Sequence, residues 1–188
     1  MNLPLPTTPG AYALQLVLYE SHEIRAGRLG RATLPPGDYL YFGSANGSGG
    51  IRGRLGRHLC GGQRTHWHID YLRSCARIQG YYYLALSKLS QTGERSEARL
   101  ECLWSQEIAS LPGAFVPLPG FGASDCRSGC PAHLLAFLPG TSPLQTGIQT
   151  PNFRERIQAA LAQAAGVAPA SVAAELVRNE FAARAMVR

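Results

Sequence analysis

The chain has 188 residues, of which 45% are hydrophobic and 16% charged, a composition that excludes a disordered chain and allows an ordinary core. Its formal net charge of +6 favours a polyanionic partner, and 17 of the 18 basic residues are arginine, which can bind a phosphate through two hydrogen bonds. A genome that favours arginine codons would give the same bias. No apolar run of about 18 residues predicts a membrane span, and residues 1–10 do not resemble a signal peptide, so we expect a cytoplasmic protein with five reduced cysteines.

The N-terminal part of the chain predicts three strands. Every second residue of 11–18 is apolar and large, which is typical of a half-buried strand. A second strand is expected within 22–34, and a turn at 35–38 leads into a short aromatic strand over 39–43. These segments together predict a small antiparallel meander.

The middle of the chain predicts helices that alternate with strands. Thr65 is a suitable cap for the second of these helices. In chain order we expect a glycine-rich loop over 44–50, helices over 51–60 and 66–75, a strand over 78–86, a helix over 92–111, an ordered loop over 112–131 and a final strand over 133–138.

The composition then shifts to Ala, Glu and Arg, with helical periodicity over 153–164 and 170–186. The predicted fold class is α+β, a small mixed but mainly antiparallel central sheet flanked by helices, with a C-terminal helical extension. Alanine-rich helices pack closely, which permits a homo-oligomer or a repair-protein partner. The expected parts are a domain over 9–138, a linker over 139–151 and the extension over 152–188.

A dense basic cluster follows the glycine-rich loop. Six arginines lie from Arg52 to Arg77, and Asp70 is the only acidic residue among them. Arg54 and His58 are four residues apart, so they share one face of the predicted helix. Such a cluster can bind phosphates and transfer protons, whereas a solvated basic face would have the same composition.

Two short motifs make the interpretation specific. Gly10-Ala11-Tyr12 and Tyr41-Phe42-Gly43 resemble the paired motifs of the GIY-YIG nuclease superfamily. In that superfamily a helix follows with an Arg and, four residues later, a His, a pattern that Arg54 and His58 match. A further His follows, and a metal-binding Glu lies on a later helix, as Glu101 does here.

Further segments are similar to an uncharacterised branch of this superfamily, the Uri-type or DUF123-like branch, which occurs alone or fused to a DNA-repair glycosylase of the endonuclease III type. Three features depart from the superfamily pattern: Ala11 replaces Ile, residues 22–37 add a hairpin, and Ser124 or Asp125 stands in the region of a late Asn. The similarity spans about 9–138 and is carried by 41–45, 57–59, 67–72, 101–102 and 121–126.

The resemblance implies a metal-dependent endonuclease that hydrolyses phosphodiester bonds in nucleic acid, with DNA favoured over RNA, in DNA repair or recombination. Glu101 is the implied ligand of Mg²⁺ or Mn²⁺, and Glu97, one turn earlier, is a rival ligand. The implied catalytic residues are Tyr12, Tyr41, Arg54, His58 and Glu101. The expected nucleic-acid-binding residues are Arg52, Arg57, Arg64, His66 and His68, although a buried structural role is an alternative for His68.

Each catalytic side chain has an expected role. Tyr12 is the first candidate for the base that activates water, and Tyr41 is the second, because a cation and a hydrogen bond can stabilise a phenolate. Arg54 would contact the scissile phosphate through charge-assisted hydrogen bonds. His58 would position water or relay the proton.

A second cluster predicts a metal site of another kind. Cys126, Cys130 and His133 form a C-x3-C-x2-H pattern, and Cys102 is a candidate fourth ligand of a structural zinc ion. Reduced thiols around a tight loop are the alternative. Two other functions stay open, a module that binds nucleic acid without cutting it and a zinc-stabilised interaction protein. The carboxylate of Glu101 favours the enzyme, because phosphate binding alone does not need an acid among the basic residues.

Overall fold

The computed structural model describes residues 4–60, 67–88, 100–139 and 153–177. The strands are β1 (Gly10–Leu18), β2 (His22–Arg25), β3 (Arg31–Leu34), β4 (Gly37–Ser44), β5 (Arg77–Ala85), β6 (Ala114–Phe115), β7 (Leu134–Phe137) and β8 (Ala173–Leu176). The helices are α1 (Gly50–Cys60), α2 (His68–Arg73), α3 (Leu100–Ala109) and α4 (Phe153–Ala165), with short 3-10 turns η1 (Gly27–Leu29), η2 (Leu86–Lys88) and η4 (Pro169–Ser171).

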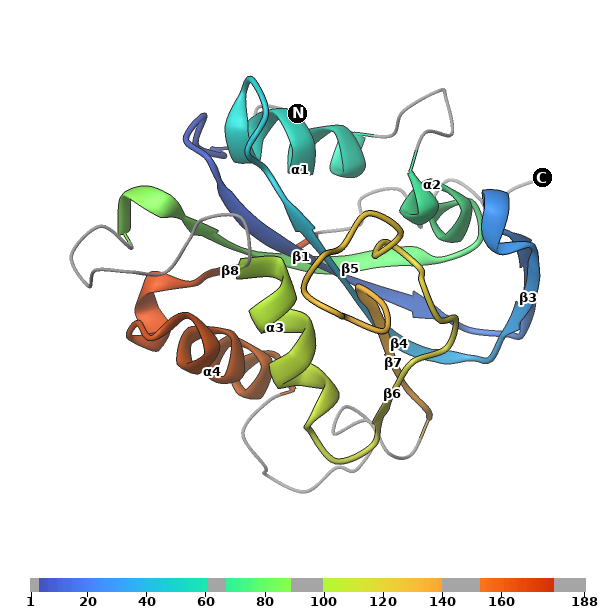
Figure 1. Ribbon diagram of the computed structural model, residues 1–188. Helices are drawn as coiled ribbons and strands as arrows, with labels where there is room; N and C mark the ends of the chain where they lie inside the picture. Colours follow the sequence, from blue (N-terminus) through green and yellow to red (C-terminus); the bar gives the residue numbers. More distant parts are fainter. Residues whose placement is uncertain (1–3, 61–66, 89–99, 140–152, 178–188) are drawn as a thin grey trace, which may run out of the picture.

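Strand β1 lies inside a six-stranded sheet of order β6-β7-β4-β1-β5-β8, in which every neighbouring pair is antiparallel (Figure 1). Its pairing with β4 sets Tyr12 opposite Gly43, and its pairing with β5 sets Tyr12 opposite Tyr83. This arrangement confirms the predicted α+β class with an antiparallel central sheet.

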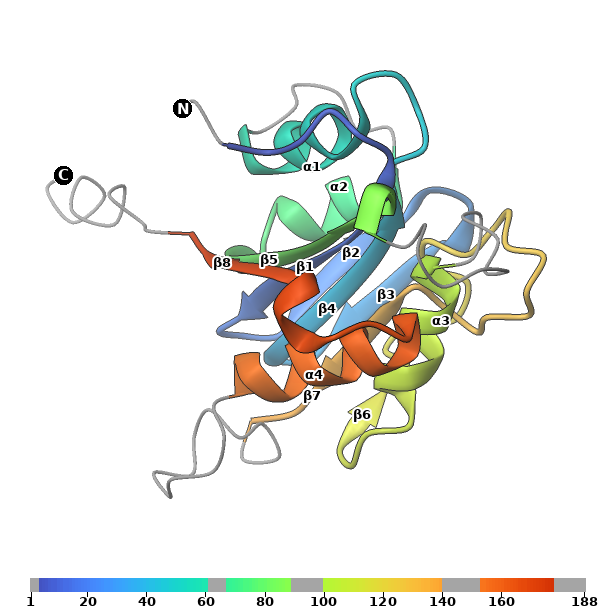
Figure 2. The same ribbon diagram turned by 90° about the vertical axis from the view of Figure 1, so that its left-hand side faces the viewer.

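Helices cover both faces of the sheet (Figure 2). Helices α1 and α2 lie over one face, on a core that includes Leu14 and Leu55. Helices α3 and α4 lie over the other face, on a core that includes Phe42 and Trp104. None of the helices that the structure describes has both the length and the hydropathy of a membrane span.

Strand β1 is buried on both faces, so the prediction of a half-buried strand is wrong. Ala11 and Ala13 are as buried as the large residues between them, and they belong to the core under α3 and α4. Gln15 is also buried, and its Oε1 accepts a hydrogen bond from the Tyr82 hydroxyl at 3.3 Å. The sequence of β1 alternates small and large side chains, a pattern typical of a strand with one exposed face. In the fold, α3 and α4 cover the face that carries the small side chains, so both faces are buried.

The segment between β1 and β4 is a separate two-stranded hairpin of β2 and β3, as the expected insertion over 22–37 predicts. The single strand expected within 22–34 is wrong, because η1 divides this segment. Gly27 (φ 55°) and Gly30 (φ 81°) provide the left-handed backbone that the reversal needs. Strand β4 already begins at Gly37, so the turn at 35–38 is shorter than expected.

Most remaining predicted elements are present with slightly shifted ends. Helices α1 and α2, strands β5 and β7 and the described part of α3 occupy the expected segments. The loop expected over 112–131 contains one short strand, β6, which pairs with β7. Thr65, Glu97 and the linker from residue 140 onward lie outside the described residues.

The C-terminal segment completes the core of the sheet. Helix α4 confirms the helix predicted over 153–164, and the indole Nε1 of Trp104 on α3 donates a hydrogen bond to the Leu161 carbonyl at 2.9 Å. The second helix, predicted over 170–186, is wrong for 173–176, which form β8 beside β5. Pro169 opens η4 instead of a long helix, and the free edge of β5 supplies backbone partners for a strand.

Candidate active site and metal cluster

The two sequence motifs meet side by side on neighbouring strands. Gly43 lies directly opposite Tyr12, and a Cβ atom at Gly43 would overlap the Tyr12 phenol. A Cβ atom at Gly10 would likewise overlap the Leu84 carbonyl on β5. The glycine of each motif is therefore explained by close packing in the sheet.

A buried phenol–imidazole pair lies at the centre of the site. The Tyr12 hydroxyl is 2.9 Å from His58 Nε2, and neither side chain has exposed surface. Tyr41 is also buried, and its ring meets His58 edge to face, with 6.5 Å between the ring centroids. Strand residues Tyr12 and Tyr41 thus converge on one histidine of α1.

Asp70 connects this pair to the surrounding arginines. Its Oδ1 lies 3.9 Å from His58 Nδ1 and 3.8 Å from Arg73 Nη1, and its Oδ2 lies 3.4 Å from Arg57 Nη2. Oδ2 also accepts the Trp67 backbone N–H at 3.0 Å, which fixes the start of α2. His58 Nδ1 makes no hydrogen bond among the described residues, but the negative charge of Asp70 favours hydrogen on that nitrogen, and Nε2 can then accept the Tyr12 proton.

Burial keeps both partners of the central pair neutral. It is the main influence on the pKa of His58, which falls to about 4, and Arg73, Arg54 and Arg57 lower it further while Asp70 raises it. Burial also raises the pKa of Tyr12 to about 12, although the charge of Arg54 and a hydrogen bond to it act in the opposite direction. Burial raises the pKa of Tyr41 as well.

Arg54 and Arg57 are held against an aromatic ring. Their guanidinium carbons lie 4.4 Å and 4.1 Å from the centroid of the Trp67 ring, a distance at which cation–π attraction is effective. The charge of Arg54 lowers the pKa values of Tyr12, Tyr41 and Glu101, so this guanidinium lies near all three. Its Nε is buried and has no hydrogen-bond partner among the described residues.

Glu101 lies in the first turn of α3 and reaches the same electrostatic environment. Burial raises the pKa of this carboxyl, and Asp125 adds to the effect, while a backbone hydrogen bond and Arg54 oppose it. The charge of Glu101 in turn raises the pKa of Tyr12. Oε2 is buried without a hydrogen-bond partner in the part of the chain that the structure describes.

The expected nucleic-acid-binding residues are more scattered. His68 is partly buried, accepts the Gly122 backbone N–H on Nδ1 at 2.9 Å and packs against Phe121, as expected for a structural histidine. Arg52 donates from Nε to the Leu5 carbonyl at 2.8 Å and lines a hollow of about 520 Å³ beside the N-terminal segment. Arg57 lies at the central cluster, whereas Arg64 and His66 lie outside the described residues.

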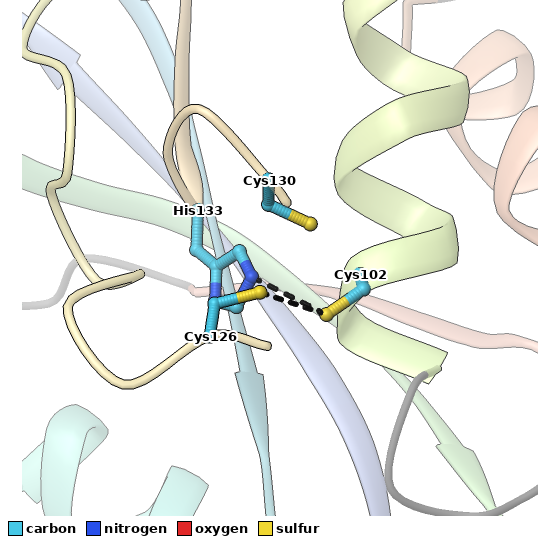
Figure 3. Close-up of side chains that lie close together, drawn as sticks. All are labelled: Cys102, Cys126, Cys130 and His133. Atoms are coloured by element: carbon cyan, nitrogen blue, oxygen red, sulfur yellow. Dashed lines mark hydrogen bonds between the residues drawn. The ribbon is translucent and has the colours of Figure 1, made fainter. Parts of the chain in front are cut away.

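The predicted cysteine and histidine ligands gather into one group (Figure 3). Cys102 comes from α3, and the other three come from the segment between β6 and β7. The Cys102 Sγ lies 3.6 Å from both Cys126 Sγ and His133 Nε2, and the four ligand atoms lie within 4.8 Å of one another. The structure therefore forms a candidate metal site.

Local hydrogen bonds favour the thiolate form of Cys126. Burial opposes ionisation of Cys126, but backbone hydrogen bonds from Cys130 and Ser128 outweigh it and lower the thiol pKa. The Ser128 N–H lies 3.4 Å from the Cys126 sulfur. The remaining cysteines are apart from the group: Cys60 is exposed, and Cys75 donates to the Leu72 carbonyl.

Asp70 is a site residue that the sequence patterns do not predict. It is the only acidic side chain in a span with six arginines, and in the fold it contacts two of them and His58. A single acidic residue in such a span is ordinarily interpreted as balancing the positive charge. Its contacts depend on how two helices pack together, and the sequence does not show that packing.

Fold and site together define an α+β domain with a buried Tyr–His–Asp arrangement, a half-buried carboxylate and a Cys3His group. The chain belongs to the family described as domain of unknown function DUF123, whose profile matches residues 11–150. This match includes both clusters and confirms the DUF123 part of the resemblance. No curated protein and no solved structure matches the chain.

Proposed function

We propose that this protein is a metal-dependent endonuclease that hydrolyses phosphodiester bonds in DNA and acts in repair or recombination. One observation carries the proposal, the convergence of the Tyr12–His58 pair, Arg54 and Glu101. A phenol from β1, an imidazole and a cation from α1 and a carboxylate from α3 meet in one electrostatic environment. Phosphodiester hydrolysis needs these groups, since it requires a proton acceptor, a phosphate ligand and a metal ligand.

Arg54 is the phosphate ligand in this proposal. Stacking on Trp67 limits the orientations of its guanidinium, so less freedom is lost when the phosphate binds. The partly exposed Arg54 can meet a substrate, whereas Tyr12 lies behind it in the core. Charge-assisted hydrogen bonds from Arg54 would stabilise the negative charge that develops on the phosphoryl oxygens.

Glu101 is the proposed ligand of Mg²⁺ or Mn²⁺. Its buried Oε2, which has no partner among the described residues, and its carboxylate chemistry fit a hard cation. When bound, such a cation supplies polarisation of the phosphate and support for the leaving oxygen. Arg54 near Glu101 limits the repulsion between the carboxylate and a phosphate.

Tyr12 and His58 form the proposed proton path. A phenol with a pKa of about 12 is protonated at neutral pH and is a poor base by itself. It can take a proton from water if its own proton passes to His58 Nε2, 2.9 Å away. Asp70 beside Nδ1 stabilises the imidazolium that this transfer forms. Tyr41 is the second candidate for the same role.

Cleavage assays on the full chain test the proposal. Labelled single-stranded DNA, duplex DNA and RNA are incubated with Mg²⁺, with Mn²⁺ and with EDTA, using the wild type, Glu101→Gln and Glu107→Gln. We expect metal-dependent cleavage of DNA that falls by roughly 100-fold or more in Glu101→Gln, since the loss of a metal ligand removes several kcal/mol of stabilisation. Glu107→Gln, on the same helix, should cleave like the wild type. If the protein binds DNA but does not cleave it under any of these conditions, the proposed enzymatic function is wrong and the protein is a module that binds nucleic acid.

A second candidate function is favoured by the cysteine and histidine group. Three thiols and an imidazole are the donor set of structural zinc, so the protein can be a zinc-stabilised interaction protein. In that case the wild type would contain zinc without cleaving any nucleic acid, and Glu101→Gln would change nothing.

A further inference from the structure

We propose that Cys102, Cys126, Cys130 and His133 bind one Zn²⁺, and that this ion holds α3 against the segment between β6 and β7 so that Glu101 stays in the active site. The zinc site stands on the geometry of the four side chains alone. The effect on Glu101 rests on the proposed nuclease function.

The spacing of the donor atoms fits a tetrahedral ion. Bonds of about 2.3 Å to sulfur and about 2.0–2.1 Å to nitrogen give tetrahedral edges of about 3.8 Å between sulfurs and about 3.6 Å between sulfur and nitrogen. The distances from Cys102 Sγ to Cys126 Sγ and to His133 Nε2 are both 3.6 Å. Figure 3 shows the four side chains pointing toward one another. The imidazole contacts this group through Nε2, a usual zinc ligand.

The direct contacts among these side chains are weak without an ion. Thiols are poor hydrogen-bond donors and acceptors, and contacts of 3.6 Å between them contribute little. Outside the group, Ser105 Oγ donates to the Ala132 carbonyl at 2.7 Å and Gln106 Nε2 donates to the Cys130 sulfur at 3.8 Å, and both bonds join α3 to this segment.

The ligands are directly connected to the catalytic cluster. Cys102 follows Glu101 in the first turn of α3. The His133 carbonyl accepts the Phe42 N–H at 2.9 Å, and Phe42 is the neighbour of Tyr41. The His133 N–H in turn donates to the Phe121 carbonyl at 2.8 Å, next to Gly122.

Gly122 completes this connection. Its N–H donates to His68, and a Cβ atom there would come 2.8 Å from the Tyr41 ring. Its φ of 74° also favours glycine. An ion bound to Cys102 and His133 therefore fixes Glu101 on one side and the surroundings of Tyr41 and His68 on the other.

Metal analysis tests the zinc site without any cleavage assay. The full chain is purified without chelator, and its zinc content is measured beside Cys126→Ser, His133→Asn and the control Cys60→Ser, which removes an exposed thiol outside the group. We expect one zinc per chain in the wild type and in Cys60→Ser, and a large loss in the other two. Cobalt added to metal-free wild type should give the visible absorption of a tetrahedral thiolate site. Wild type that binds neither metal, or that carries a Cys102–Cys126 disulfide instead, overturns the proposal.

The positioning of Glu101 has a separate test. Hydrogen exchange at the amides of Glu101, Phe121 and Gly122 should be faster in metal-stripped protein than in zinc-loaded protein. The Mg²⁺ concentration for half-maximal cleavage should rise about tenfold or more in Cys126→Ser and stay unchanged in Cys60→Ser. Unchanged exchange and unchanged Mg²⁺ dependence would overturn the positioning role. Zinc-loaded wild type that never cleaves would remove the nuclease function and leave the zinc site in place.

Discussion

Tyr12 and His58 form a hydrogen bond that solvent does not reach, and three arginines and one carboxylate act on the imidazole. Asp70 raises the pKa of His58, while Arg54, Arg57 and Arg73 lower it, and burial lowers it more than any of them. The imidazole is therefore neutral in the fold at pH 7 and can accept a proton from Tyr12. Burial and the three arginines disfavour a positive charge on it, and Asp70 offsets part of this cost.

The low pKa of His58 predicts a loss of stability in acid. Its pKa is about 4 in the folded protein and 6.5 in the unfolded chain, so between these values the unfolded chain binds more protons. Protonation of His58 therefore does not affect the free energy of unfolding above about pH 6.5. As the pH falls toward 4, it lowers this free energy, by about 2 kcal/mol at pH 5.

Urea denaturation at pH 7 and pH 5 measures this effect. We expect the wild type to lose about 2 kcal/mol more between these pH values than His58→Gln, which cannot bind the proton. Burial also lowers the pKa values of His68 and His133, so the comparison between the two proteins isolates the share of His58. Equal losses in both proteins would show that His58 titrates normally in the fold.

At the scale of elements, the pairing of β1 with β4 builds the site. The register sets Gly43 opposite Tyr12, and the phenol passes over the glycine toward His58 on α1. A side chain at this position would occupy the space of the phenol. The second motif thus contributes Tyr41 to the site, and its Gly43 leaves the space that the Tyr12 phenol occupies.

Gly43→Ala should therefore impair both stability and cleavage. The added methyl overlaps Tyr12, and we expect about 1–3 kcal/mol lower free energy of unfolding and a lost Tyr12–His58 hydrogen bond. Gly47→Ala is the matched control, because its Cβ atom would meet nothing within 4 Å. Denaturation and DNA cleavage of the two variants give the answer. Similar results for both would show that β4 accommodates the methyl without moving Tyr12.

Local patterns predicted most elements because their periodicity agrees with the final packing. One exception, β8, shows where such patterns fail. Its residues Ala173–Leu176 have good helical propensity, but the open edge of β5 offers them backbone hydrogen bonds. A sheet edge is a product of the whole fold, so the sequence of this segment cannot reveal it.

At the scale of the whole molecule, the fold brings together side chains that are far apart in the sequence and that were grouped only by the order of the motifs. Tyr12, Arg54 and His58 were grouped by the resemblance of two motifs and one helical spacing to the superfamily pattern, and the fold brings Tyr12 to His58. The proximity of Glu101 to Arg54 could be expected only from the resemblance. Helix α3 is distant in sequence from α1 and lies over the opposite face of the sheet. Asp70 escaped prediction because its role depends on contacts between α1 and α2. The metal cluster was predictable as a spacing but not as a tetrahedral arrangement.

The net charge of +6 and the arginines on α1 predict salt-dependent binding of nucleic acid. Each phosphate contact releases condensed counterions, so the logarithm of the affinity should fall linearly with the logarithm of the salt concentration. Arg57→Gln should weaken binding to all sequences alike and make the slope shallower by about 1. Arg31→Gln removes the same charge from the β2–β3 hairpin, where the arginine is exposed and pairs with Glu23. If the basic face of α1 is the contact surface, Arg31→Gln keeps the wild-type slope in titrations of labelled DNA. Equal changes in the two variants would mean that overall charge attracts DNA, and α1 would lose its assignment as the binding surface.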